Sequence, residues 1–473
     1  METKKRKRKL NVKLFDYALI GSAIIYLLAE LYNKSIPFKY AMVLFLIVII
    51  LMAIGLLVNR KGAKVTLAIS ILIAAAGLFY MQYSIDTLVN FDQFQTNTVS
   101  LVVLEDSPYE AIEDLHDNTT LAVSTNFNQN LYEAMLEDLE NIYPLNGNVE
   151  RYDSDISVVD ALYDGTIEVM VLDEVFRDTV VESQEDFNNK TRVIYSYEKH
   201  NEKNDIAKEV DVRKEGFTIF ISGIDVDGPI STVSRSDVNI LMTVNPDTNE
   251  ILLTTTPRDS YVELGCAQGY MKDKLTHAGT MGIECSISTL ENLYDIDINY
   301  YAKVNFTSLI TLIDVLGSVD VSSQYDFYGH DGTHFTQGMN TLNSAQALEF
   351  SRTRKTVPGG DITRGLHQLE VIKGIINKLT QPSVLLNING IVNKVSSSVD
   401  TNFGSNNLSR LIEKQLNDGK GWSFNQASLG GVSGGDYTYS YPNQILSVYY
   451  PDEASVAEIH QLITNTLQSN NDQ

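Results

Sequence analysis

The sequence predicts a membrane-anchored α/β protein, in which three apolar helices precede two folded α/β units. Three apolar runs fill most of the first 83 residues. From residue 99 onward, short apolar stretches alternate with stretches that have the helical period of about 3.6 residues. A chain of 473 residues is also too long for one compact domain. We therefore expect an anchor followed by two units.

The anchor is predicted from apolar runs at 14–32, 38–58 and 65–83, which follow a basic tail at 1–13. Each run is about long enough to cross ~30 Å of hydrocarbon at ~1.5 Å per residue. A cleavable signal peptide would explain one such run but not three in series. We therefore predict three transmembrane helices within 14–83, followed by a polar linker at 84–98.

Basic residues indicate the orientation of this anchor. The tail "METKKRKRKLNVK" precedes the first span and "NRKGAK" joins the second to the third, so both are expected in the cytoplasm. Such a tail also resembles a nuclear-localisation or nucleic-acid patch, but its position directly before a span favours a topology signal. Everything after the third span is then expected to lie outside the cell.

The charge of that outer region restricts its partners. Residues 1–64 hold 12 Lys and Arg and three Asp and Glu, so the rest of the chain holds 24 and 57, a net formal charge of −33. A region this acidic is not expected to bind nucleic acid by neutralising phosphates. A phosphate-bearing ligand would need a local cationic pocket or a metal ion.

The first folded unit is predicted at 99–213. "SLVVL", "TLAVS" and "IEVMVLD" have the pattern of strands, and "NQNLYEAMLEDLENI" has the pattern of an amphipathic helix. The charged segment 197–216 is predicted to be its boundary. Its acidic residues are scattered along helix faces and are expected to be a solvated surface, so we predict an accessory unit without a catalytic site.

The second unit is predicted at 217–380, and a mixed tail at 381–473 is expected to extend it. "FTIFISGID" and "DINYYAKVNF" are predicted strands, and "DVNILMTVNPDTNEILLTTTPRD" is a predicted hairpin that turns at "NPDTN". The predicted helices are "CSISTLENLYDI", "NFTSLITLIDVLG", the beginning of "SAQALEFSRTR", and "DITRGLHQLEVIKGIINKL".

The hairpin should bring charged residues together at its open end. A turn centred on 247–248 places Asp237 opposite Arg258, at the ~4.5–5.5 Å spacing of antiparallel partners. Asp225 reaches the same end if its strand is antiparallel to its neighbour. A surface salt bridge would explain a single pair, whereas two carboxylates beside two arginines suit Mg²⁺ and a bound anion. The expected cluster contains Arg235, Asp237, Arg258 and Asp259.

A second cationic group lies in "FSRTRKTVPGGDITRG". In an extended segment Arg352 and Arg354 would point the same way, as a fork for phosphate oxygens. Arg364 and Gln368 are four residues apart and share a helix face, which continues into an apolar stripe. An arginine in the first turn opposes the helix dipole, and a bound anion would resolve that conflict. Scattered surface arginines and an ordinary core stripe are the alternatives.

Cys266 and Cys285 are the two cysteines of the chain. An even number of cysteines in an oxidising compartment suggests one disulfide that closes a short loop, and two free structural thiols are the alternative.

Seven segments together resemble, in order, the motifs of the LytR-CpsA-Psr family. They are "SGID", "SRSDVNILMTVNP", "ILLTTTPRDSYVEL", "KDKLTHAG", "LENLYDIDINYYAKVNF", "LNSAQALEFSRTR" and "GDITRGLHQLEVIKGI", and they cover roughly 217–380. The three spans and the additional domain are similar in layout to the capsule-biosynthesis members of this family. The resemblance implies an α-β-α core, with a mixed central sheet flanked by helices.

The resemblance also implies a function. Such proteins move a glycopolymer, capsular polysaccharide or a teichoic-acid-like polymer, from a polyprenyl-pyrophosphate carrier to peptidoglycan in Gram-positive envelopes. By motif, Asp225 and Asp237 would bind Mg²⁺ or Mn²⁺, and Arg258 would be the residue most sensitive to replacement. The pyrophosphate would be held by Arg235, Arg258, Lys274, Arg352, Arg354, Arg364 and Gln368, with Asp361 orienting arginines. Apart from the resemblance, phosphoryl transfer needs charge neutralisation and positioning, and a carboxylate near the metal, Asp237 or Asp259, would serve as general base.

Two other functions stay open at this point. A pyrophosphatase acting on the same lipid would use the same pocket, with water in place of the sugar hydroxyl. A non-catalytic, membrane-anchored regulator of capsule synthesis is the other possibility, although the acidic exterior disfavours direct contact with DNA.

Overall fold

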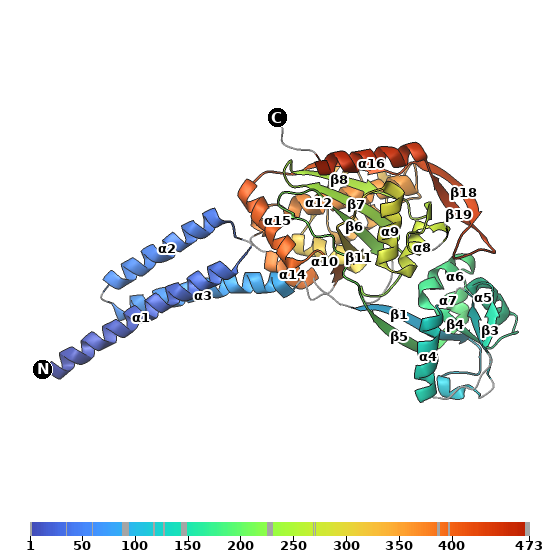
Figure 1. Ribbon diagram of the computed structural model, residues 1–473, viewed down its shortest axis with the longest axis horizontal. Helices are drawn as coiled ribbons and strands as arrows, with labels where there is room; N and C mark the ends of the chain where they lie inside the picture. The colour runs from blue at the N-terminus through green and yellow to red at the C-terminus, as the bar shows by residue number, and fades with distance from the viewer. Residues whose placement is uncertain are drawn as a thin grey trace.

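The computed structural model describes residues 2–34, 36–58, 60–87, 94–116, 119–125, 128–142, 149–224, 230–267, 269, 271–385, 388–395 and 398–468. Figure 1 shows the described chain as a helical N-terminal arm, a core with central strands, and a smaller α/β unit beside the core. The predicted α/β fold class, with three apolar helices at the N-terminus, is confirmed.

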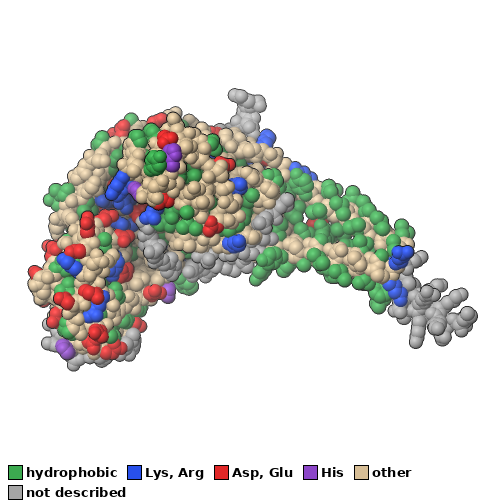
Figure 2. Space-filling model, turned by 180° about the vertical axis from the view of Figure 1, so that it is seen from behind, with side chains coloured by type: hydrophobic (Ala, Val, Ile, Leu, Met, Phe, Trp, Pro, Cys, Tyr) green, Lys and Arg blue, Asp and Glu red, His purple; other side chains and the backbone are tan. Residues whose placement is uncertain are grey.

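The N-terminal arm contains three helices that are long and apolar enough to cross a membrane, at Leu14–Tyr32, Phe38–Leu57 and Lys61–Tyr83. They belong to α1 (Glu2–Tyr32), α2 (Phe38–Leu57) and α3 (Lys61–Thr87), so the basic tail continues α1 as helix. Apolar side chains cover the arm in Figure 2, as expected for surfaces that face lipid. The start of α2 contacts the core, where Lys39 Nζ donates to the Asn417 carbonyl at 2.6 Å.

The accessory unit is a five-stranded sheet in the order β3-β2-β4-β1-β5. Its α4 packs on one face, and α5 and α6 pack on the other. The elements are β1 (Phe94–Leu104), η1 (Ile112–Asp114), β2 (Leu121–Ser124), α4 (Gln129–Ile142), β3 (Val149–Tyr152), α5 (Asp155–Tyr163), β4 (Val169–Asp173), η2 (Glu174–Phe176), α6 (Arg177–Ser183), α7 (Phe187–Lys190) and β5 (Thr191–Glu202).

Two expected boundaries of this unit differ from the structure. The segment expected as a linker holds the end of α3, which reaches Thr87, and the beginning of β1 at Phe94. The charged segment after residue 197 begins inside β5. The physical reason is that β1 and β5 pair along their whole length, from Phe94 opposite Glu202 to Leu104 opposite Thr191. Backbone pairing therefore orders polar residues that side-chain composition assigns to loops.

The core contains a six-stranded sheet in the order β16-β11-β6-β7-β8-β17. The β6–β7, β7–β8 and β11–β16 pairs are antiparallel, whereas β6–β11 and β8–β17 are parallel, so the sheet is mixed. The strands are β6 (Phe217–Ile224), β7 (Val238–Asn245), β8 (Glu250–Thr255), β11 (Tyr300–Asn305), β16 (Val399–Thr401) and β17 (Ser423–Ser428).

Helices pack on both faces of this sheet. On one face α9 (Ile283–Tyr294) and α16 (Glu453–Gln468) bury Leu290 and Ile463 against it. The other face carries α12 (Asp361–Leu379) and α15 (Ser405–Asp418), and beyond them a second apolar cluster joins α10 (Phe306–Leu316), α11 (Ser344–Arg352) and α14 (Ile388–Val395). The smaller elements are β9 (Tyr261–Glu263), β10 (Lys272–Lys274), α8 (Leu275–Ala278), η3 (Gly279–Met281), β12 (Val319–Ser323), β13 (Phe327–Tyr328), β14 (His334–Phe335), β15 (Gly338–Leu342) and α13 (Pro382–Leu385).

The C-terminal region completes the core. Both edge strands of the sheet, β16 and β17, come from the segment expected to extend the second unit. The hairpin of β18 (Gly431–Tyr437) and β19 (Ile445–Pro451) follows β17 and reaches the accessory unit, where Gln444 Nε2 donates to Ser183 Oγ at 3.5 Å. The connection between these two strands therefore contacts the accessory unit, which the mixed composition of this segment does not indicate.

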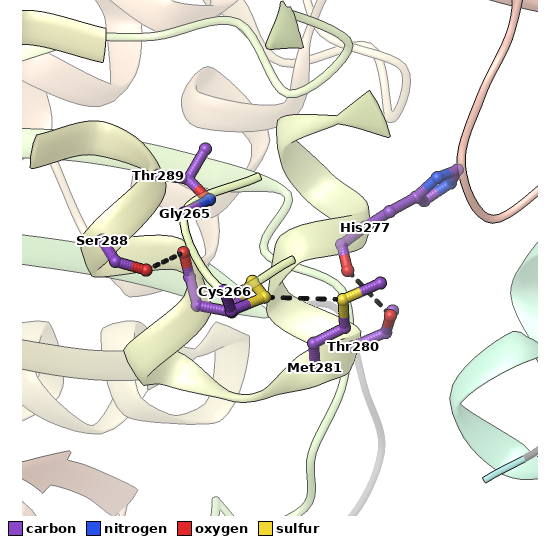
Figure 3. The surroundings of a disulfide bond; sticks show 8 residues. Gly265, Cys266, His277, Thr280, Met281, Ser288 and Thr289 are labelled. Atoms are coloured by element: carbon purple, nitrogen blue, oxygen red, sulfur yellow. Dashed lines mark hydrogen bonds between the residues drawn. A yellow bond between two sulfur atoms is a disulfide. The ribbon is translucent and has the colours of Figure 1, made fainter. Parts of the chain in front are cut away.

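The predicted disulfide between Cys266 and Cys285 is present (Figure 3). It joins the loop after β9 to the first turn of α9, and the thioether sulfur of Met281 lies 3.6 Å from Cys266 Sγ. The bond closes a loop with a sequence separation of 19 residues, which carries β10, α8 and η3. This loop includes Lys274 and Thr276, which belong to the site described next.

Candidate functional site

A cleft of ≈ 240 Å³ lies at the open end of the β7–β8 hairpin. Three parts of the core meet there, namely the ends of the two strands, the first turns of α12, and the β18–β19 hairpin. The cleft is lined by Asp237, Val238, Asn239, Thr255, Thr256, Pro257, Arg258, Asp259, Gly359, Asp361, Ile362, Arg364, Gly365, Gln368, Ser433, Ser447, Val448 and Tyr449. Both cationic groups that the sequence singles out contribute to it.

The pairing across the hairpin is as expected. Ile240 lies opposite Thr255, and continuing this register outward places Asp237 opposite Arg258. Arg258 Nη1 donates to Asp237 Oδ1 at 2.8 Å, and the hydroxyl of Thr276 donates to the same oxygen at 3.2 Å. The Asp237 amide bonds the Gly223 carbonyl of the antiparallel β6, so β6 ends beside Asp237. Asp225 itself lies outside the described residues.

A second ion pair lies next to this one. Lys274 Nζ is 3.0 Å from Asp259 Oδ1, and Arg258 Nε is 4.0 Å from Asp259 Oδ2. The backbone amide of Thr276 bonds the Arg258 carbonyl, so the disulfide-closed loop is joined directly to the end of β8. Lys274 is buried beside the cleft and its ammonium contacts a residue of the cleft wall.

The turn "VPGGD" delivers Arg364 to the cleft. Gly359 and Gly360 both have positive φ, at 80° and 56°, which favours glycine, and α12 begins directly after them at Asp361. Arg364 Nη2 lies 3.3 Å from Asp361 Oδ1. Burial lowers the pKa of Arg364 and the cations Arg258 and Arg354 lower it further, although Asp361 opposes them. Asp237 also opposes these cations, so Arg364 lies among two cations and two carboxylates.

The arginine fork expected from an extended segment is not formed. Arg352 is the last residue of α11, and its guanidinium lies over the Phe306 ring, 4.5 Å from the centroid. The helix runs further than expected because the Thr353 amide still bonds the Glu349 carbonyl. Arg354 is exposed and lies 3.8 Å from Asp361, outside the cleft lining. The pyrophosphate role of both arginines remains an expectation.

Gln368 lies in the cleft wall, one turn after Arg364, and its Nε2 is 3.4 Å from the Ser351 carbonyl. The apolar stripe that follows packs in the core, where Ile372 and Ile376 contact the cluster around Leu369. His367 is buried in a stack between Phe327 and Phe350, and burial lowers its pKa to about 4. This neutral histidine supports the helix that carries Arg364.

Arg235 is held by residues that the sequence places on a solvated surface. Asp178 and Glu182, both in α6 of the accessory unit, lie 3.3 and 3.0 Å from its guanidinium nitrogens. Glu182 also lies 3.6 Å from Arg258. The expectation that the accessory acids face only solvent is therefore wrong for these two. Their i, i+4 spacing places them on one helix face, but nothing in the sequence names their partners.

Two further groups of site residues were missed. Thr276 orients Asp237, and Ser433, Ser447 and Tyr449 bring the C-terminal hairpin to the cleft wall. Among the residues that the structure describes, no group of three or more His, Cys, Asp or Glu side chains is arranged to hold a metal ion.

Comparisons with known proteins identify relatives of the core. A model described as the LytR_cpsA_psr family matches residues 178–461. The polyisoprenyl-teichoic acid–peptidoglycan teichoic acid transferase TagU of Bacillus subtilis is 37% identical over 204 residues, which are 42% of this chain and 65% of that protein. TagU of Enterococcus faecalis is 34% identical over 201 residues, again 42% of this chain and 65% of the relative.

The chain thus matches slightly less than two thirds of the length of these relatives. Among solved structures, the crystal structure of B. subtilis TagU is 29% identical, with a TM-score of 0.43. The match covers 54% of this chain and 99% of that one.

Proposed function

The chain belongs to the LytR-CpsA-Psr family, and on that premise we propose that it is a cell-envelope phosphotransferase. It would move a glycopolymer from a polyprenyl-diphosphate carrier to peptidoglycan. The names of the TagU relatives, which describe transfer of teichoic acid to peptidoglycan, support this reaction class.

The convergence of Arg258, Arg364 and Lys274 at one cleft carries the proposal. The half-buried Arg364 lies 3.3 Å from Asp361, a carboxylate that it shares with the exposed Arg354. A diphosphate in the cleft would accept charge-assisted hydrogen bonds from these groups. Arg258, Arg364 and Lys274 at one cleft match what phosphoryl transfer requires, namely charge neutralisation and positioning.

The carboxylate of Asp237 is the kind of ligand that Mg²⁺ prefers. Mg²⁺ needs only one or two protein carboxylates and takes its other ligands from water and phosphate oxygens. Asp237 lines the cleft, and the resemblance adds Asp225, which comes next in the sequence after β6 and lies outside the described residues. We propose that these two residues hold Mg²⁺ or Mn²⁺, which would neutralise charge on the diphosphate.

The residues of the cleft suggest how the transfer proceeds. A sugar hydroxyl of peptidoglycan attacks the phosphorus on the glycan side of the diphosphate, the bond to the bridging oxygen breaks, and polyprenyl phosphate leaves. Arg258 and Arg364 stabilise the negative charge that the leaving group gains. The proton of the hydroxyl passes to a carboxylate, for which Asp237 and Asp259 are the candidates. Both accept hydrogen bonds or ion pairs from cations, which fixes their orientation.

We further propose that the chain crosses the membrane three times, with the core outside the cell. The basic tail and the basic turn between α2 and α3 lie on one side of the three spans, which favours the cytoplasm for that side. The core contacts the opposite side, through Lys39 and Tyr40 at the start of α2. A lipid-linked substrate would then approach the cleft from the outer leaflet.

The test uses the full-length protein in liposomes with a polyprenyl-diphosphate-linked glycan, Mg²⁺ and a peptidoglycan acceptor. Arg258→Ala and Asp237→Ala should each lower the rate of transfer by about 100-fold or more, as loss of a charge-stabilising group does. Lys355→Ala is the matched control, because Lys355 is an exposed cation near the site that does not line the cleft.

The products distinguish the alternatives. Polymer attached to peptidoglycan together with polyprenyl phosphate supports the transferase. Release of free phosphorylated polymer at the same rate with and without acceptor would identify a pyrophosphatase. Unchanged attachment in both Ala variants would contradict a catalytic role for this cleft.

A further inference from the structure

Helix α6 of the accessory unit reaches into the arginine cluster of the core. Figure 1 shows α6 at the boundary between the two units, below the β18–β19 hairpin. Glu182 Oε1 lies 3.0 Å from Arg235 Nη1 and 3.6 Å from Arg258 Nη2, and Asp178 Oδ2 lies 3.3 Å from Arg235 Nη2. Arg258, which lines the cleft, and Arg235, which the resemblance assigns to the diphosphate, are therefore contacted by carboxylates from a different unit.

The position of α6 is fixed on both sides. Within the accessory unit Thr179 and Val180 are buried, and Val180 belongs to the cluster under the sheet. Toward the core, Ser183 accepts a hydrogen bond from Gln444, and Phe176 packs edge-on against Tyr441. Asp178 and Glu182 lie one turn apart on the helix face that points to the core. Ordinary packing therefore holds the two carboxylates at the arginines.

Carboxylates and phosphates compete for the same donors. A guanidinium has five N–H groups in a fixed fork, and Asp178 and Glu182 lie at the two terminal nitrogens of Arg235, where a phosphate would have to compete with them. The Arg235 side chain is only 9% exposed, so it has little room to turn toward a second anion. The side chains of Asp178 and Glu182 are 49% and 45% exposed, so water can hydrate the two carboxylates when they leave Arg235.

Other carboxylates lie close to Asp178 at this contact. Burial raises the pKa of Asp178, the neighbouring carboxylates Asp237 and Glu182 raise it further, and Arg235 opposes them. Four carboxylates, those of Asp178, Glu182, Asp237 and Asp259, thus lie at two guanidinium groups before any diphosphate is present. Binding of a diphosphate would add further negative charge at this position. It would therefore repel the carboxylates of Asp178 and Glu182, which come from the accessory unit.

We propose that the carboxylates of Asp178 and Glu182 on α6 bind Arg235 and Arg258 until a diphosphate displaces them. This inference rests on the proposed function, because it takes the same cleft as the diphosphate site. The inference gives the accessory unit a role, because the unit would set the affinity of the cleft for a diphosphate. A ligand would need enough negative charge to displace the two carboxylates. Weakly charged anions would be excluded.

The experiment measures binding of farnesyl diphosphate, a short polyprenyl diphosphate, to the full-length protein in detergent with Mg²⁺, by titration calorimetry. The double variant Asp178→Asn, Glu182→Gln removes the competing charges and keeps the size of the side chains. We expect it to bind farnesyl diphosphate about fivefold more tightly than the wild type, from the loss of partly exposed ion pairs. Glu185→Gln, an exposed acid just beyond α6, is the matched control and should bind like the wild type.

The outcomes separate the two proposals. If the double variant binds farnesyl diphosphate as the wild type does, the carboxylates do not compete and the inference is wrong. Weaker binding would also overturn it, since the carboxylates would then be positioning the arginines. If neither the wild type nor any variant binds, the proposed function itself fails. Fluorescence of the single tryptophan, Trp422 in the core, checks that each variant is folded.

Discussion

The disulfide offers a prediction whose size follows from the length of the loop that it closes. Cys266 and Cys285 are 19 residues apart, and closing a loop of that length in the unfolded chain corresponds to about 3 kcal/mol. Reduced wild-type protein, and a variant with Cys266→Ser and Cys285→Ala, should therefore have a free energy of unfolding lower by about this amount.

Trp422 makes the measurement specific to the core. It is the only tryptophan, and its Nε1 donates to Gln415 of α15 at 2.8 Å, so its fluorescence reports the unfolding of this unit. With a urea dependence of about 2 kcal/mol per molar, the midpoint should fall by about 1.5 M. Met281→Leu, which changes the neighbour of Cys266 and leaves the loop closed, should shift it by less than about 0.5 M.

If oxidised and reduced wild-type protein unfold at the same urea concentration, the disulfide does not stabilise the core and the prediction is wrong. That result would mean that the unfolded loop is already restricted, or that packing alone fixes β10 and α8. The functional consequence is separate from stability. Because the loop carries Lys274 and Thr276, reduction should also weaken diphosphate binding under conditions in which Trp422 still reports a folded core.

Three further predictions concern the support of the cleft. Since the pKa of His367 is lowered to about 4, the unfolded protein binds a proton at higher pH than the folded one does. The wild type should therefore lose about 1.4 kcal/mol of stability per pH unit, relative to His367→Gln, as the pH falls from about 6.5 to 4, measured by urea titrations of Trp422. Gly279→Ala should lower the free energy of unfolding by about 1–3 kcal/mol in the same assay, because a Cβ would lie 2.7 Å from the Ser236 backbone nitrogen. Gly404→Ala should lower it by less, because the space around Gly404 is open. Arg258→Lys should restore only a small part of the activity lost in Arg258→Ala, measured as transfer rate, because an ammonium cannot hold Asp237 and a phosphate in the fork geometry of a guanidinium.

Local rules explain why the centre of the cleft could be predicted from the sequence. A hairpin turn sets the register of both its strands, so the pairing of Asp237 with Arg258 follows from the position of "NPDTN". The glycine pair before α12 likewise fixes where that helix begins, and hence where Arg364 lies. The error at Arg352 is local too, since one further backbone hydrogen bond turns an expected extended segment into the end of a helix.

Contacts between distant segments could not be predicted in this way. Asp178 and Glu182 lie in a helix whose composition is that of an ordinary solvated surface, and only the packing of the accessory unit against the core directs them to Arg235. The C-terminal hairpin is a similar case, because its pattern of small and polar residues does not show that Ser447 and Tyr449 reach the cleft. Such residues gain a role from tertiary structure, which periodicity does not encode.

The charge of the chain explains why the cleft needs cations at short range. The region after residue 64 has a net formal charge of −33, which repels a diphosphate at long range. At physiological ionic strength the Debye length is ~8 Å, so a diphosphate at the cleft mainly interacts with Arg258, Arg364 and Lys274 and with the carboxylates beside them. Desolvation strengthens those short-range contacts, while salt weakens the long-range repulsion. Moderate salt should therefore speed the approach of the diphosphate, the opposite of its effect on proteins that attract phosphates through a basic surface.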